Sequence, residues 1–550
     1  ITSFVDLSAI VPGVTVAKNE GYKTIISIRG VGNETNQNAI AAPSVAYHMD
    51  GGFIASPFAL GTDFLDVERI EVLRGPQGTL FGQNSTGGAV NVISRAPTTE
   101  GAEGKLSVTF GDDNLKKVRP SNNFVISDKI ASRFSISSTT RDGFTENVVT
   151  GQDLDDDNNK SFRTDWMFDL NDTSSLRVFG QNFKVDRNGA AMRGIDDKTS
   201  GMRKLSQDTV SQHELSSMVV AAIYESDLGY ANLKIIASVQ EDDVLVVRDN
   251  DRHNYLDPVL SIEGLPAGST YQRAEFTPET SLVDTSTFEI NLVSNEPALN
   301  GKLDWTVGAF YMDHEIENVI RGYRDDDLDG RIKYLCDESF ADPSYCYDHD
   351  YGIPGRFDIF GPNAEVDFFT DANPSRESYS VYAQTTYSLA DAFRIVSGLR
   401  YSEDTFTTDV TNFLNVESFQ EEGTTDEITS RVVAEVDFSV DIMGYFALAK
   451  GFKPGGSNLT FGFDDDNAPP MVFPTFEAET VDSVEFGLKS VFADGAARAN
   501  IAVFSYTYEN LQFQATDPDI YRGGVANIPQ SEMSGLEIEF TGFLSDSLSL

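Results

Sequence analysis

From about residue 104 onward, polar and apolar residues alternate in short segments, which is the period of a β-strand with two different faces. In segment 482–492, Glu485 and Lys489 fall on one face, and apolar side chains fall on the other. The apolar face holds Val484, Phe486, Leu488 and Phe492. Segments 378–387 and 534–541 alternate in the same way, so the pattern predicts many strands whose two faces meet different surroundings.

The connections between these segments differ in length in a systematic way. Short turns fall at 127–129, 171–174, 227–229, 389–392, 493–495 and 544–546. Long polar connections cover approximately 143–160, 188–212, 249–283, 321–376, 406–426, 454–477 and 514–531. Short turns at one end and long loops at the other are typical of transmembrane β-barrels, whereas a soluble β-sandwich has no reason for the asymmetry. The pattern therefore predicts a transmembrane antiparallel β-barrel, with apolar faces toward lipid and carboxylates toward the lumen.

This rhythm gives about 16 or 17 strands, the last of which begins near Ser547. An open barrel edge would expose unpaired backbone groups to hydrocarbon. We therefore expect further C-terminal strands beyond Leu550.

Residues 1–100 lack the hairpin rhythm and are rich in Gly, Ile and Val, as in IVPGVTV (10–16) and TIISIRGVG (24–32). They predict a compact mixed α/β domain that precedes a β-barrel over residues 101–550. A strand, a turn with Gly75, Pro76 and Gly78, and a second strand follow one another in its last third.

Composition narrows the possible functions. The net charge is -45, from 86 acidic and 41 basic residues. This charge argues against a nucleic-acid partner, because phosphate contacts need clustered Lys and Arg. No apolar run approaches the roughly 18 residues of a membrane helix, so any passage through a membrane would use strands.

The two cysteines, Cys336 and Cys346, lie in one polar segment rich in Asp, Tyr and Gly. No CxxC metal or redox motif is present. Their sparse, close spacing favours one disulfide that closes a loop in an oxidising compartment.

The stretch VERIEVLRGPQGTLFGQNSTGGAVN at 67–91 strongly resembles the plug domain of TonB-dependent receptors. SIRG at 27–30 and the segment 45–52 resemble earlier plug motifs, while Phe81 replaces the common Tyr. Further segments resemble the family's barrel strands in order and spacing. They are AKGFKPGG (449–456), ETVDSVEFGLKS (479–490), YENLQ (508–512) and SGLEIEF (534–540).

The resemblance implies a plug inside a 22-stranded barrel in the outer membrane of a Gram-negative-type bacterium. It also implies a TonB box upstream of Ile1, and it implies TonB and outer-membrane lipid as partners. The expected function is import of a small extracellular ligand, without a cofactor and without catalysis. A ferric siderophore or other iron chelate is the commonest substrate class, and cobalamin and oligosaccharides are the alternatives.

In this family two plug arginines pair with two lumenal glutamates, and the matching residues here are Arg29, Arg74, Glu485 and Glu537. Alternation places both glutamates on the lumenal face independently. Because breaking a buried ion pair costs about 3–5 kcal/mol, this cluster is expected to latch the plug to the barrel. The alternative is that these are ordinary charges on strand surfaces.

The plug glycines are expected to permit positive φ and close packing of turns. They are Gly30, Gly75, Gly78, Gly82, Gly87 and Gly88. A phosphate-binding loop is the rival interpretation, and it lacks the Lys-Ser/Thr that would follow the glycines.

Ligand contacts are expected from plug loops that point outward, which mix amides and aromatics. The candidates are Asn33, Asn36, Gln37, Phe53, Phe58, Gln83 and Asn84. Solvation of the loops explains the same composition.

Two further motifs suggest metals only weakly. Asp325, Asp327 and Asp329 are spaced like the start of a calcium loop, but the twelfth position is Cys336 rather than a bidentate Glu. HExxH at His314 is incomplete, and no GxSxG nucleophile motif is present, so we expect no enzyme.

Two rivals from other classes remain. A passive porin would need an open lumen and no separate N-terminal domain, which residues 1–100 oppose. A secreted β-sandwich adhesin would lack the asymmetry of loop lengths.

Overall fold

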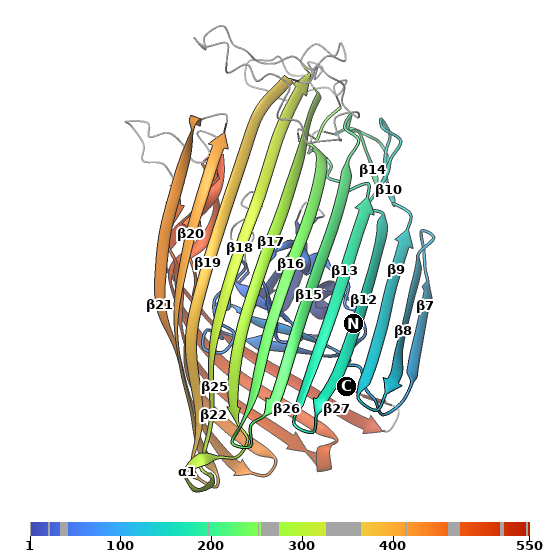
Figure 1. Cartoon of the computed structure of the whole chain (residues 1–550). Helices are drawn as coiled ribbons and strands as arrows, with labels where there is room; N and C mark the ends of the chain where they lie inside the picture. The colour runs from blue at the N-terminus through green and yellow to red at the C-terminus, as the bar shows by residue number, and fades with distance from the viewer. Residues whose placement is uncertain are drawn as a thin grey trace.

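A computed structural model shows a tall wall of antiparallel strands around an N-terminal domain (Figure 1). It describes residues 2–19, 22–32, 42–195, 197–250, 252–254, 274–325, 365–412, 415–459, 474–517, 522–545 and 548–549. Within these ranges, seventeen strands belong to the wall. This number confirms the estimate from the alternation of polar and apolar residues.

The wall strands follow chain order from β7 to β28, and the paired strands are antiparallel. They are β7 (Glu103–Phe110), β8 (Lys116–Ser127), β9 (Ile130–Arg141), β12 (Asp157–Asn171), β13 (Ser174–Arg187), β15 (Gln212–Asp227), β16 (Ala231–Asp249), β17 (Ala274–Ser294), β18 (Leu303–Asp325), β19 (Glu365–Ala390), β20 (Phe393–Asn412), β21 (Asn415–Ser439), β22 (Ile442–Lys453), β25 (Glu479–Phe492), β26 (Ala497–Asp517), β27 (Arg522–Ser545) and β28 (Leu548–Ser549). Shorter elements in the connections are β10 (Thr145–Asn147), β11 (Asp153–Leu154), β14 (Lys204–Leu205), α1 (Ala298–Gly301), β23 (Gly456–Ser457), β24 (Thr475–Phe476) and η5 (Ala493–Gly495). Among the described helices, none has the length and apolar character to cross a bilayer.

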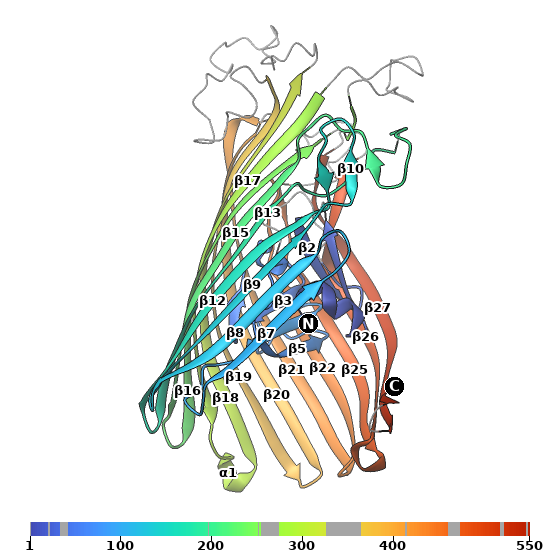
Figure 2. The same cartoon turned by 90° about the vertical axis from the view of Figure 1, so that its right-hand side faces the viewer.

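Short turns gather at one end of the wall, as predicted (Figure 1, Figure 2). The described long connections, from β9 to β12 and from β13 to β15, lie at the other end and carry the short strands β10, β11 and β14. Two expected loops were wrong. Most of 406–426 continues β20 and β21, where Val410 pairs with Phe419, and most of 514–531 continues β26 and β27, where Gln514 pairs with Val525. These regions lost their alternation because strands that extend beyond an apolar band can be polar on both faces.

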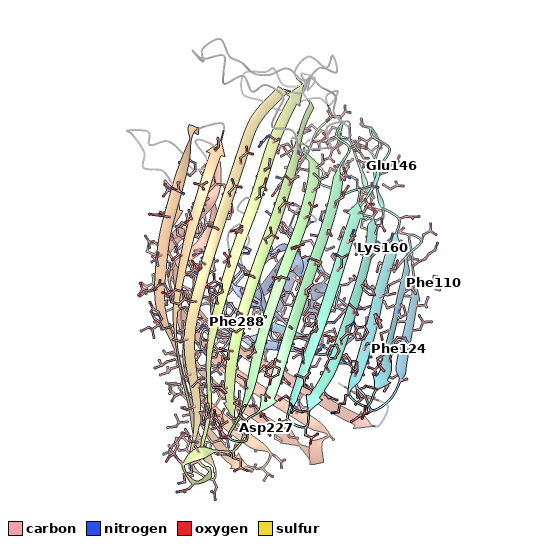
Figure 3. The ribbon with its side chains drawn as sticks, viewed as in Figure 1. Phe110, Phe124, Glu146, Lys160, Asp227 and Phe288 are labelled. Carbon is pink, nitrogen blue, oxygen red and sulfur yellow. The ribbon has the colours of Figure 1, made fainter. Side chains whose placement is uncertain are left out.

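The alternation of faces predicted from the sequence is confirmed. On β25, Phe486 is 58% exposed, whereas Glu485 points inward and forms an ion pair. Phe110, Phe124 and Phe288 are likewise exposed on the outer face, where their rings project from the wall (Figure 3). The outside of the wall is therefore apolar and the inside polar.

The N-terminal domain is built mostly from strands. Its elements are η1 (Phe4–Ala9), β1 (Val14–Asn19), β2 (Lys23–Ile28), β3 (Val45–Met49), β4 (Gly52–Ile54), η2 (Phe58–Gly61), β5 (Val67–Arg74) and β6 (Gly88–Ser94). The mixed α/β expectation needs a correction, because the helical part in the described residues is limited to two short 3-10 helices. Runs of β-branched residues, together with the helix breakers Pro12 and Gly13, favour strands here.

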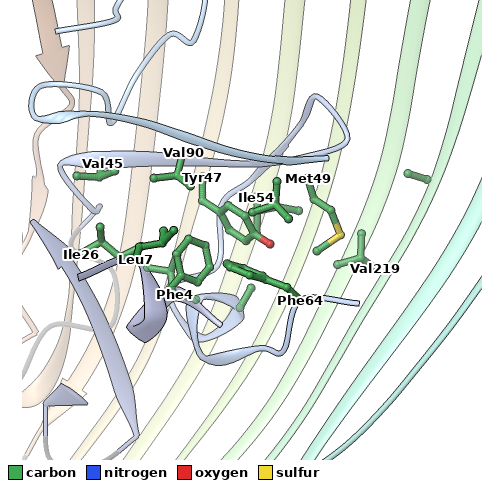
Figure 4. Close-up of a cluster of buried hydrophobic side chains, with 14 of the residues drawn as sticks. Phe4, Leu7, Ile26, Val45, Tyr47, Met49, Ile54, Phe64, Val90 and Val219 are labelled. Atoms are coloured by element: carbon green, nitrogen blue, oxygen red, sulfur yellow. The ribbon is translucent and has the colours of Figure 1, made fainter. Parts of the chain in front are cut away.

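Four of these strands form a sheet in the order β4-β3-β6-β5, with β3 and β6 parallel. A buried cluster under this sheet includes Phe4, whose ring centroid lies 4.8 Å from that of Tyr47 and 4.7 Å from that of Phe64 (Figure 4). Val219 of β15 belongs to the same cluster. The core of the domain is therefore continuous with the inner face of the wall.

Candidate functional site

Arg29 joins the N-terminal domain to the wall. It follows β2 with a φ of 54°, and its amide donates a 2.7 Å hydrogen bond to the carbonyl oxygen of Gly13. Nη1 lies 2.7 Å from Oε2 of Glu485 on β25, and Nη2 lies 2.7 Å from Oε2 of Glu537 on β27. Nε donates a 3.0 Å hydrogen bond to Oε1 of Glu537. The planar guanidinium thus bridges two carboxylates from different strands.

Arg74 adds a second cation beside the first. It ends β5, and its Nη1 lies 3.3 Å from Oε2 of Glu537. The same nitrogen donates a hydrogen bond to Glu539. Sequence reasoning missed the role of Glu539, although alternation places it on the same face as Glu537. We call these five residues the arginine–glutamate cluster.

Aromatic side chains complete the environment of Arg29. Its guanidinium carbon lies 4.0 Å from the ring centroid of Phe504, and its Nη1 donates a hydrogen bond to the hydroxyl of Tyr506. Tyr445 donates a 2.5 Å hydrogen bond to Oε1 of Glu485. Burial alone would lower the pKa of Arg29, but hydrogen bonds to the glutamates and the neighbouring Tyr506 more than offset it and raise that pKa. The guanidinium therefore stays charged.

A cavity of about 310 Å³ borders the arginine–glutamate cluster. Arg74, Glu485, Glu537 and Glu539 contribute to its lining. Water on this side would hydrate the separated charges, which lowers the cost of breaking the ion pairs.

A second ionic network, missed by sequence reasoning, joins the domain to β12 and β13. Asp50 lies in the β3–β4 turn, and its Oδ2 is 2.8 Å from Nη2 of Arg163. Its Oδ1 is 3.4 Å from Nη1 of Arg177. Asp165 pairs with both arginines, at 2.9 and 2.6 Å. All four side chains are buried.

Asp50 also accepts hydrogen bonds from Ser94, at 2.9 Å from the amide and 2.6 Å from the hydroxyl. Burial would raise the pKa of Asp50, but Arg163, Arg177 and Ser94 more than offset this, so the pKa is lowered. The carboxylate is thus ionised within a fully bonded network. We call Asp50, Ser94, Arg163, Asp165 and Arg177 the aspartate network.

Comparison with known proteins identifies the family to which this domain and the surrounding wall of strands belong. Residues 1–89 match the family described as TonB-dependent Receptor Plug Domain, and residues 103–550 match the family described as TonB dependent receptor-like, beta-barrel. The chain belongs to the TonB-dependent receptor family. Members of this family are outer-membrane receptors and transporters rather than enzymes. The domain boundary predicted near residue 100 lies between the two matched ranges and stays a prediction.

Individual relatives are similar over nearly the whole chain. The probable TonB-dependent siderophore receptor PiuA of Acinetobacter baumannii is 23% identical over 592 residues, which cover 100% of this chain and 71% of PiuA. The pesticin receptor of Yersinia pestis is 24% identical over 557 residues, covering 98% of this chain and 70% of that receptor. The crystal structure of the ferric yersiniabactin uptake receptor FyuA from Yersinia pestis superimposes with a TM-score of 0.76 at 17% identity, covering 100% and 74% of the two chains.

Two of the predicted plug glycines show why this receptor needs glycine there. Gly82 has a φ of 78°, and a Cβ atom on it would lie 2.7 Å from Nη2 of Arg400. Gly75 has a φ of 79°, and its Cβ would lie 2.7 Å from the hydroxyl of Tyr506. Gly30 and Gly88 also have positive φ, and Gly78 and Gly87 approach their neighbours closely.

The structure buries the described candidates for ligand binding. Phe53 packs against Phe310 of the barrel, with ring centroids 6.0 Å apart. Gln83 accepts a 3.2 Å hydrogen bond from Ser378. Phe58 and Asn84 are buried as well. A ligand would reach these side chains only after the plug moves, and their role in binding stays a prediction.

Several predicted sites fall outside the described residues. These are Asn33, Asn36, Gln37, Cys336, Cys346, Asp327 and Asp329, together with the side chain of Asp325. In the part of the receptor that the structure describes, no group of three or more His, Cys, Asp or Glu side chains is arranged to hold a metal ion.

Proposed function

We propose that this receptor lies in the outer membrane of a Gram-negative bacterium and imports a ferric siderophore in a TonB-dependent cycle. The observation that carries the proposal is the plug inside the barrel, held to separate parts of the wall by the arginine–glutamate cluster and the aspartate network. A passive porin would have an open lumen. A plug held by displaceable ion pairs fits a channel that opens only when work is done on it.

The relatives support iron as the cargo. PiuA is described as a siderophore receptor and FyuA as a ferric yersiniabactin uptake receptor, and both are similar to this chain over nearly its full length. In the proposed cycle, a ferric chelate binds above the plug at the end with the long loops. TonB then pulls the plug from the other end, the ion pairs separate, and the chelate passes inward.

Uptake by cells that express the full-length receptor tests this proposal. Radioactive iron would be supplied as a tris-catecholate, a tris-hydroxamate or a carboxylate chelate, with cobalamin as a further substrate, in strains with and without functional TonB. We expect uptake of at least one ferric chelate that disappears without TonB, at equal receptor abundance. Uptake of cobalamin alone would change the substrate class, and uptake that persists without TonB would refute the energised cycle.

A further inference from the structure

The strands β20, β21 and β22 are neighbours in the wall (Figure 2). One basic side chain on each of them contacts the plug. Arg431 donates a 2.9 Å hydrogen bond from Nη1 to Oε1 of Gln77. Arg400 lies against Gly82, where a Cβ atom would be 2.7 Å from Nη2. Lys453 donates a 3.3 Å hydrogen bond from Nζ to the hydroxyl of Ser44.

The strand register places these three cations at successive heights. Arg400 pairs with Thr429, which lies two residues beyond Arg431 toward the long-loop end of the wall. Arg431 pairs with Ala449, and Lys453 lies four residues beyond Ala449 in the same direction. At a rise of about 3.4 Å per residue, the steps are about 7 Å each. We call Arg431, Arg400 and Lys453 the basic ladder.

No carboxylate of the described residues lies within salt-bridge distance of the basic ladder. The acids nearby have other partners. Glu479 accepts a 2.8 Å hydrogen bond from Oγ1 of Thr86 and a 2.9 Å hydrogen bond from the backbone amide of Gln512. Glu289 accepts a 2.5 Å hydrogen bond from Tyr382. By contrast, Arg163 and Arg177 on β12 and β13 both pair with carboxylates.

Burial makes these unpaired charges costly. Arg400 and Lys453 are 4% and 1% exposed. A charge buried without a counter-charge destabilises the folded state by several kcal/mol. Among the described residues, both cations have only neutral partners. Arg400 donates a 3.3 Å hydrogen bond to Ser402 and lies 4.9 Å from the ring centroid of Tyr382, and Lys453 bonds to Ser44. These partners compensate a buried charge less than a carboxylate does, so the charges point to a state in which they are used.

Plug segment 75–87 and the adjoining Ser44 contact all three residues of the ladder and cover Arg400 and Lys453. Thr429, opposite Arg400 in the strand register, donates a 2.9 Å hydrogen bond from Oγ1 to the carbonyl oxygen of Gly78. The Gly87 amide donates a 2.8 Å hydrogen bond to the carbonyl oxygen of Ser44. Ser44, which covers Lys453, is therefore connected to the same plug segment. Movement of this one segment would uncover Arg400 and Lys453 together, whereas Arg431 is half-buried and already lines the cavity beside the arginine–glutamate cluster.

We propose that the basic ladder is a transit path for an anionic ferric chelate, in which Arg400 and Lys453 are covered while the plug is seated and are exposed when segment 75–87 is pulled aside. The proposal rests on the proposed function and specifies its substrate class. The receptor carries a net charge of -45, so its overall field repels an anion, and a local row of unpaired cations supplies the attraction that the whole chain lacks. Successive sites of moderate strength let a ligand enter and also leave.

The uncovering is tested by cysteine labelling in cells. Thr429→Cys places a thiol beside Arg400 under Gly78, and a sulfonate-bearing or a trimethylammonium-bearing methanethiosulfonate is added from outside. We expect labelling only with functional TonB, with the anionic reagent reacting about tenfold faster than the cationic one. Arg400→Gln in the Thr429→Cys background should abolish this preference. The receptor without Thr429→Cys measures the reactivity of Cys336 and Cys346.

A transport measurement tests the ladder independently of that cysteine. Arg400→Gln is expected to slow TonB-dependent uptake of an anionic tris-catecholate chelate about tenfold, with little change for a neutral tris-hydroxamate chelate. Arg400→Lys should keep most of the rate. Lys160→Gln, on the outward face of β12, is the control that removes an equal charge without effect. Affinity for the chelate at the extracellular side should not change, because Arg400 is covered when the chelate first binds.

The outcomes separate the two proposals. Labelling of Thr429→Cys without a charge preference, or no labelling while wild-type receptor imports iron, would overturn the basic ladder as a path. Equal slowing of anionic and neutral chelates by Arg400→Gln would overturn it as well. If wild-type receptor imports no ferric chelate at all, the proposed function fails, and the labelling experiment still decides whether the ladder becomes exposed.

Discussion

Oδ2 of Asp50 in the plug lies 2.8 Å from Nη2 of Arg163 on β12, with both side chains buried. On β25 and β27 the polarity is reversed, because there the plug supplies the cations and the wall the carboxylates. The plug therefore fits the barrel in one rotational setting only, since a rotated plug would bring like charges together. The two contacts also differ in exposure, because the arginine–glutamate cluster borders a cavity, whereas the four charged side chains of the aspartate network are buried.

Replacement of Asp50 is expected to loosen the plug strongly. Asp50→Asn keeps the shape and suits the positive φ of 52°, but it leaves Arg163 and Arg177 with only Asp165 as counter-charge. Removing one partner of a buried ion pair costs about 3–5 kcal/mol. Hydrogen exchange of the β3 and β6 amides in the detergent-solubilised receptor measures this loss.

The control for Asp50→Asn is Glu68→Gln, which removes a carboxylate from an exposed pair with Arg69 at 3.0 Å. An exposed pair contributes only about 0–1 kcal/mol, so protection of the same amides should hardly change. Equal effects of the two substitutions would show that the aspartate network does not anchor the plug.

Arg29→Lys is expected to weaken the arginine–glutamate cluster, although the charge is kept. A lysine ammonium cannot span Glu485 and Glu537 with the geometry of the guanidinium fork. Loss of charged hydrogen bonds should destabilise the plug by about 1.5–3 kcal/mol, seen as faster hydrogen exchange of β1 and β2. Arg69→Lys makes the same replacement in an exposed arginine and should leave the exchange rates nearly unchanged. Identical rates in wild type and Arg29→Lys would contradict the bridging role.

The sequence was sufficient to predict the barrel wall. Alternation with a period of two residues shows which face of the wall a side chain occupies, and the length of a connection shows at which end of the barrel it lies. It also placed Glu485 and Glu537 inside. The partners of those glutamates came from the family resemblance and not from periodicity. Alternation gives the face of a residue but never the residue opposite it across the lumen.

That limit explains why the aspartate network was missed. Asp50 is separated from Arg163 by 113 positions and from Arg177 by 127. The one local signal was Arg163 and Asp165 on the same face of a strand, a cation and an anion together in the lumen. The turn at 50–52 was part of the family motif, but the motif does not state what its aspartate contacts.

Gly82→Ala is expected to cost more than Gly30→Ala, although both glycines have a φ of 78°. An alanine at either position should cost about 1–2 kcal/mol for the left-handed backbone conformation. Only at Gly82 does the new Cβ meet a neighbour, Nη2 of Arg400 at 2.7 Å, whereas no atom lies within 4 Å at Gly30. The difference between the two variants in hydrogen exchange of β5 and β6 therefore isolates the contact with Arg400. Equal destabilisation would mean that Arg400 moves aside without cost.

His48 on β3 is expected to make the plug less stable in mild acid. Burial, and to a lesser extent the charge of Arg400, lowers the pKa of His48 to about 3. Its ring packs between Phe53 and Phe81, with centroid distances of 5.4 and 5.1 Å. The folded plug therefore keeps His48 neutral, while the unfolded plug takes up a proton below about pH 6.5.

Because the unfolded state binds the extra proton, the stability from neutral His48 is complete above pH 6.5 and falls as the pH drops toward 3. Between pH 6.5 and 5.0 the free energy of plug unfolding should fall by about 1.5 kcal/mol more in wild type than in His48→Gln. Asp50 does not interfere with this measurement. Its pKa is lowered from 3.8 in the folded plug, so the stability that it contributes is lost mainly below pH 3.8 and not between pH 6.5 and 5.0. Urea titration with a fluorophore on exposed Ile10→Cys follows plug unfolding at each pH. Parallel pH profiles for the two receptors would show that His48 is protonated in the folded plug or reaches water.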